Sequence, residues 1–112
     1  MRPEIRKLLT DMREAAEAIL QFVSGKSLDD LAKDKLLRSG IYYQFMIIGE
    51  ALAQLRQADP PTAERISESS RIIGFRNQVI HGYAKIDDEI TWRIIQDKLP
   101  ILICELDELL RS

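Results

Sequence analysis

Apolar residues recur every three or four positions along most of this chain, which is the spacing of helices that bury one face. The first segment has a single such stripe, formed by Ile5, Leu8, Leu9, Met12, Ala15, Ala16, Ile19, Leu20 and Val23. Pro3 suits the first turn of a helix and Gly25 suits the position after its end. The pattern therefore predicts a helix from Pro3 to about Ser24.

Capping and helix-breaking residues divide the next part of the chain. Ser27 is a predicted N-cap, followed by acidic residues where the helix dipole favours them, for a short helix that runs through Leu31. A longer helix is predicted from about Asp34 to Gln57. The sequence Asp59-Pro60-Pro61 should end it, because a proline inside a helix removes a hydrogen bond.

Three further segments follow. Thr62 is predicted to cap a short helix that reaches about Ser69. The next helix should run from about Ser70 to His81 and stop at Gly82. Asp87 or Asp88 should cap the last segment, which reaches Leu110 with a break or kink at Pro100. Strand-like alternation never persists beyond a few residues, so the predicted fold class is all-α.

The long middle helix is unusual because apolar residues surround most of its circumference. From Ile41 to Ile48 its residues are apolar or aromatic almost all the way round, interrupted by Gln44. A surface helix of a small bundle needs only one apolar stripe. Two interpretations remain open: a central helix contacted on several sides, or a helix with one face in an oligomer interface.

The composition limits the class of protein. The 112 residues, 46 % of them apolar, suit a single domain over residues 1–112 with its own core. The longest nearly apolar stretch is far shorter than the roughly 18 residues that read as a membrane span, and no leader opens the chain, so we expect no membrane association and a cytoplasmic location. Cys104 is the single cysteine, which excludes an internal disulfide and any multi-cysteine metal site.

The charge is nearly balanced but unevenly distributed. Sixteen basic and eighteen acidic residues give a net charge of −2, which argues against broad, non-specific phosphate binding. Residues 69–86 nevertheless contain Arg71, Arg76, His81 and Lys85 and no acid. Any nucleic-acid site is therefore expected in this stretch.

Arg76 occupies a costly position on its predicted helix. At about 100° per residue it falls in the middle of the apolar stripe, which is an unfavourable place for a permanent charge. That stripe consists of Ile72, Ile73, Phe75, Val79 and Ile80. A buried carboxylate or a cleft shared with another subunit should compensate Arg76, and Glu50, in the otherwise apolar run 47–52, is the candidate carboxylate.

His81, the only histidine, lies five residues after Arg76 and about 140° around the helix. The two side chains can cooperate only if the helix is distorted near Gly82 or if a second chain takes part. Asn77 is four residues before His81, so its amide could orient the imidazole. These residues alone leave open a structural histidine and a catalytic one. They give no nucleophile elbow, no metal-ligand spacing and no Gly-rich phosphate loop.

The stretch Arg76-Asn77-Gln78-Val79-Ile80-His81-Gly82-Tyr83 resembles the signature of the HEPN superfamily, which is an Arg, a polar residue, three more residues and a His. Its His-Gly-Tyr extension resembles the HepT-like subgroup, toxins of type VII toxin–antitoxin modules. The opening helix, the turn at 22–27 and the runs 47–51, 72–77 and 97–100 look like that family in the same order. The resemblance covers nearly the whole chain.

The resemblance implies an antiparallel helical bundle of four to five main helices that forms a homodimer and acts as a metal-independent endoribonuclease on RNA. Carried over by position, Arg76 and His81 are the catalytic pair and Asn77 is the polar residue of the motif; Glu50 is added as a supporting residue from the apolar pattern alone. Tyr83 is the regulatory tyrosine, to which a nucleotidyltransferase antitoxin transfers AMP. ATP and Mg²⁺ serve that partner, and this chain needs no metal or cofactor.

Two other functions stay open at this stage. One is a non-catalytic helical adaptor that binds a protein through the broad apolar middle helix. The other is a catalytically silent HEPN domain that binds a nucleotide or an RNA end. An RNA cleavage assay with and without a His81→Ala substitution separates both from a ribonuclease.

Overall fold

The computed structural model describes residues 1–82 and 86–112, and every regular element in these two ranges is a helix. In chain order the helices are α1 (Pro3–Val23), α2 (Leu28–Lys33), α3 (Lys35–Ala58), α4 (Pro60–Glu64), α5 (Ser69–His81), α6 (Asp88–Asp97) and α7 (Leu99–Arg111). The predicted all-α fold class is confirmed. In these ranges no helix is long and apolar enough to cross a membrane.

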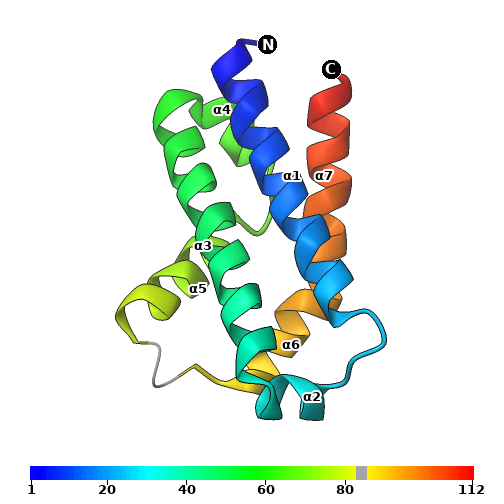
Figure 1. The fold of residues 1–112 in the computed structure, drawn as a ribbon. Coiled ribbons are helices and arrows are strands. Elements are labelled where there is room, and N and C mark those ends of the chain that lie inside the picture. Colours follow the sequence, from blue (N-terminus) through cyan, green and yellow to red (C-terminus); the bar gives the residue numbers. More distant parts are fainter. Residues whose placement is uncertain (83–85) are drawn as a thin grey trace.

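The long helices form an antiparallel bundle. Helix α1 runs antiparallel to α3 and α7 and packs against both, and the two chain ends lie at the same end of the bundle (Figure 1). Helices α2 and α6 contact each other at the opposite end. Helix α5 packs against α3, so the segment that carries the motif is held by the middle helix of the bundle (Figure 1).

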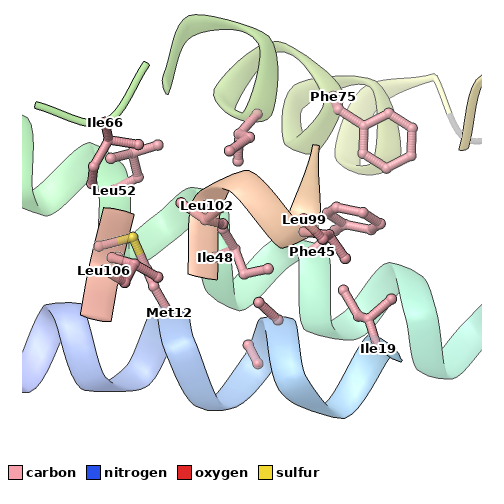
Figure 2. Packing of buried hydrophobic residues seen from close by; sticks show 14 of the residues in the cluster. Met12, Ile19, Phe45, Ile48, Leu52, Ile66, Phe75, Leu99, Leu102 and Leu106 are labelled. Atoms are coloured by element: carbon pink, nitrogen blue, oxygen red, sulfur yellow. The ribbon is translucent and has the colours of Figure 1, made fainter. Parts of the chain in front are cut away.

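The core lies where α1, α3 and α7 meet and extends beneath α5. Figure 2 shows side chains from these helices converging, among them Met12, Ile19, Phe45, Ile48, Leu52, Phe75, Leu99, Leu102 and Leu106. Each is less than 5 % exposed. Burying a side chain of this size contributes about 1.5–3 kcal/mol, so the stripes predicted from the sequence are what holds the bundle together.

Helix α3 is a central helix, as the apolar residues around most of its circumference suggest. It contacts α1, α2, α4 and α5 and buries Ile41, Phe45 and Ile48. Tyr43 and Met46 remain 61 % and 38 % exposed. The neighbouring helices of the same chain therefore cover most of the apolar surface of α3 and leave one apolar strip uncovered.

The turn between α1 and α2 is formed as predicted. Gly25 adopts a φ of +74°, a left-handed conformation that suits glycine. Ser27 caps α2: its hydroxyl accepts a hydrogen bond from the Asp30 N–H, and the Asp30 carboxylate accepts one from the Ser27 N–H at 2.8 Å. The hydrogen bonds that the Ser27 N–H and hydroxyl donate to the Asp30 carboxylate lower the pKa of that carboxyl below its usual value.

Two predictions near prolines are wrong in detail. The short helix begins at Pro60 and ends at Glu64, and Asp59 caps it in place of Thr62 by accepting hydrogen bonds from the Thr62 N–H and hydroxyl. Similarly, the final break falls at Lys98 rather than at Pro100. The reason is the same in both places, because a proline fits the first turn of a helix and so marks a beginning as readily as an end.

Candidate active site

Helix α5 presents the motif and is anchored through one face. Ile72, Phe75 and Val79 are buried on this face, and the Phe75 ring meets Phe45 of α3 edge-on, with ring centroids 4.8 Å apart. Edge-to-face aromatic pairs contribute about 0.5–1.5 kcal/mol beyond the area they bury. The backbone that carries the motif residues is therefore fixed against the centre of the bundle.

Arg76 lies at a close approach of α5 to α3. An added Cβ at Gly49 of α3 would lie 2.5 Å from both Cβ and Cγ of Arg76, closer than real side chains come. A glycine is thus required at position 49 for the arginine to lie across α3. The sequence pattern did not reveal this role, although a glycine inside an apolar helical run is the signal that could have done so.

The Arg76 side chain is largely buried but makes few polar contacts. The side chain is 17 % exposed, and Nε is buried without a hydrogen-bond partner in the described part of the chain. Nη1 lies 3.7 Å from Oε2 of Glu50, so the predicted partner is found. The expectation of a buried carboxylate is wrong, since the Glu50 side chain is 61 % exposed and water screens the pair.

His81 and Asn77 point elsewhere. Both are exposed, and no hydrogen bond joins them among the residues that the structure describes. Helix α5 is regular through His81, and the Gly82 N–H closes its last turn on the Gln78 carbonyl at 2.7 Å. Distortion near Gly82 therefore does not bring Arg76 and His81 together within one chain. Tyr83 lies outside the described residues.

A shallow groove of about 890 Å³ runs along the uncovered strip of α3, between α1 and the end of α5. Tyr43, Met46, Ile47 and Ile80 give it apolar walls, and Glu50 borders it. Because Ile80 is one helical turn after Arg76, the guanidinium lies at the edge of this groove. The apolar strip and the charged site thus share one face of the molecule.

The described residues contain no group of three or more His, Cys, Asp and Glu side chains close enough to hold a metal ion. Cys104 is exposed and forms no disulfide. The chemical groups gathered around α5 are a guanidinium, a carboxylate, an amide and an imidazole. They can bind a phosphate and exchange protons with it.

Residues 12–109 match the family described as Ribonuclease HepT-like. A relative from Methanocaldococcus jannaschii named "Putative RNase MJ0127" is 27 % identical over 109 residues, which cover 97 % of this chain and 89 % of that protein. "Probable ribonuclease HepT" from Thermococcus cleftensis is 26 % identical over 113 residues, covering 97 % and 98 %. No solved structure gives a significant match. By the extent of the family match, this chain belongs to the HepT-like ribonuclease family.

Proposed function

We propose that this protein is a metal-independent endoribonuclease that acts as the toxin of a toxin–antitoxin module. Arg76 and His81 are its catalytic residues, and Asn77 and Glu50 support them. The family membership and the names of the relatives support an RNA substrate. The position of Arg76 supports the assignment of the site.

The observation that carries the proposal is that the buried Nε–H of Arg76 has no hydrogen-bond partner among the described residues. A permanent charge in the apolar stripe of α5, with a buried Nε–H and only a distant, exposed carboxylate beside it, is unfavourable for the fold alone. A phosphate oxygen would satisfy it, because a guanidinium offers a planar fork of donors with a fixed charge. The only histidine of the chain lies on the same helix.

The reaction that these groups suit is internal transesterification of RNA. A neutral imidazole takes the proton of the 2′-hydroxyl, the 2′-oxygen attacks phosphorus, and the bond from phosphorus to the 5′-oxygen breaks. The guanidinium stabilises the extra negative charge on the phosphate, and an imidazolium returns a proton to the leaving 5′-oxygen. The products are a 2′,3′-cyclic phosphate and a 5′-hydroxyl.

One chain has too few groups for these steps. It holds a single histidine, and the regular helix α5 keeps that histidine about 140° away from Arg76. A homodimer in which two α5 helices face each other provides two imidazoles and brings the guanidinium of each chain to the shared cleft. The groove along α3 is the face we assign to this interface, because its exposed apolar side chains border the Arg76 site.

We assign Tyr83 as the site at which the toxin is switched off, by analogy with the family. A nucleotidyltransferase antitoxin would transfer AMP from ATP to the phenolic oxygen, with Mg²⁺ held by that partner. The added phosphate and base would compete with RNA for the cationic site near the end of α5. The role of Tyr83 therefore concerns inhibition and not the cleavage step.

The experiment is cleavage of single-stranded RNA in EDTA by the wild type, Arg76→Ala, His81→Ala and, as a matched control, Arg111→Ala at the far end of α7. The wild type and the control should cleave at the same rate and leave 2′,3′-cyclic phosphate ends, while the other two variants lose at least about 100-fold. Activity retained by His81→Ala, or abolished by EDTA, contradicts the proposed mechanism. A wild type without any cleavage favours the adaptor or binding-domain alternatives.

A further inference from the structure

A second groove, of about 440 Å³, lies between α5, α6 and the start of α7. Each of its two walls is one face of a helix, formed by residues at i, i+3, i+4 and i+7. The α5 wall includes Arg71, Gly74 and Gln78, and the α6 wall includes Ile90 and Arg93. The volume falls in the range of pockets that hold one small organic ligand.

The groove combines an apolar floor with cations. Phe75 and Ile94, both less than 10 % exposed, form the floor, and Ile90 remains 48 % exposed at the side. Gly74 leaves the α5 wall open, because a Cβ built there meets no atom within 4 Å. A flat heterocycle could therefore lie against this floor without moving the backbone.

Two of the three cations at the rim, Lys98 and Arg71, are held in place by one carboxylate. Glu68 binds Lys98 through one oxygen at 3.2 Å and contacts Arg71 through the other at 3.7 Å. Arg93 has no ion pair within residues 1–82 and 86–112. Asp97 is the one acid in the lining, and with Glu68 it offsets two of the three cations, so the rim keeps one positive charge in excess in a chain whose net charge is −2.

The groove also adjoins the proposed catalytic histidine. Measured around α5 from Arg76, His81 lies at about 140°, and Gly74 and Gln78 lie at about 160° and 200°. The imidazole and the groove thus share one side of α5, opposite the side on which Arg76 packs against α3. A strand bound in the groove can reach His81 directly.

We propose that this groove is a nucleotide subsite that holds one residue of the single-stranded RNA beside the scissile bond, an inference that rests on the ribonuclease function proposed above. The base lies against the apolar floor, with the Gln78 amide at its edge as both donor and acceptor. Arg93 and Arg71 bind the backbone phosphates. A base in a duplex cannot enter such a groove, so the site selects unpaired RNA.

Binding can be tested without cleavage. The probe is a fluorescein-labelled single-stranded 2′-O-methyl oligonucleotide, which lacks the nucleophile, and its anisotropy is followed with the full-length protein at several salt concentrations. Arg93→Gln should raise Kd about tenfold and reduce the salt dependence (log Kd against log salt) by about 0.7, the value for one lost phosphate contact on a single strand. Arg111→Gln removes the same charge at the last residue of α7, which does not line the groove, and should change neither quantity.

Gly74→Leu tests the base-binding part separately. The added side chain fills the groove from an exposed helical position, so the circular dichroism spectrum should not change. Kd should rise at least about fivefold with an unchanged salt slope, because no charge is lost.

Three results overturn the subsite: no binding by the wild type at low salt, equal behaviour of Arg93→Gln and Arg111→Gln, or wild-type affinity in Gly74→Leu. The proposed function is judged by the cleavage assay alone. A protein that binds as expected but cuts no RNA refutes the ribonuclease and leaves the groove as a nucleotide-binding site with no scissile bond beside it. A protein that cuts RNA while Arg93→Gln binds normally refutes only the subsite.

Discussion

Gly49→Ala is expected to destabilise the protein and to impair its activity, although alanine is the better helix former. In an unobstructed helix interior the substitution would gain about 1 kcal/mol. Here the new methyl group would lie 2.5 Å from Cβ and Cγ of Arg76. A change of rotamer could move Cγ, but Cβ is fixed to the backbone, so α5 has to move by about 1 Å to restore an ordinary carbon–carbon contact.

Overpacking of this kind typically costs about 1–3 kcal/mol. Because the clash involves a Cβ that cannot move without the backbone, we expect the upper part of this range, about 2–3 kcal/mol. Subtracting the gain of about 1 kcal/mol in helix propensity leaves a net loss of about 1–2 kcal/mol, which lowers Tm by roughly 5–10 °C in a domain of this size. A 1 Å displacement of a catalytic group can cost about 100-fold, so cleavage should fall by more than the loss of folded protein explains.

The assay is thermal unfolding followed by circular dichroism, with RNA cleavage measured well below Tm. Gly74→Ala is the matched control, because it lies in an exposed helical position where a Cβ meets nothing, and it should raise Tm by a few degrees. If Gly49→Ala is as stable as the wild type or more stable while Gly74→Ala behaves as expected, the close approach of α3 and α5 at Arg76 is refuted.

Met46→Glu places a charge on the exposed strip of α3 and should convert a dimer into a 12.9 kDa monomer in sedimentation, whereas Ile101→Glu, at a similarly exposed apolar position on α7, should leave the dimer intact. Hydrogen bonds from Ser27 lower the pKa of Asp30, so this carboxylate stabilises the fold above its usual pKa of 3.8, and the contribution disappears as the pH falls through the lower folded value. Asp30→Asn should therefore flatten the loss of stability in this acid range in urea unfolding, and an unaltered pH profile contradicts the assignment. Tyr83→Phe should still cleave RNA but gain no AMP in intact-mass spectrometry after incubation with the antitoxin and ATP, and equal labelling of both proteins places the modification elsewhere.

The helix ends were predictable where local chemistry determines them. Ser27 with Asp30, and Gly25 with its positive φ, act through their immediate neighbours, so a single sequence reveals them. Pro60 was misjudged because a proline can stand at the first turn of one helix as well as behind another. Only the rest of the fold decides between these two positions.

The candidate site was predictable in its residues but not in its geometry. Arg76 stands out from the sequence because it interrupts an apolar stripe, and Glu50 because it interrupts another, and the structure brings these two together. Gly49 was missed because its role depends on the distance between two packed helices. Helical spacing alone placed His81 away from Arg76, and a single chain cannot reveal whether a second copy closes that gap.

Subunit mixing tests the central claim, a ribonuclease site shared between two chains, most directly. Wild type and His81→Ala are denatured together in equal amounts, refolded and assayed in EDTA against the same total concentration of wild type. If each cleft needs both imidazoles, only wild-type pairs are active, and random pairing leaves about one quarter of the activity. A residual activity of about one half, which is what independent chains would give, contradicts the shared site.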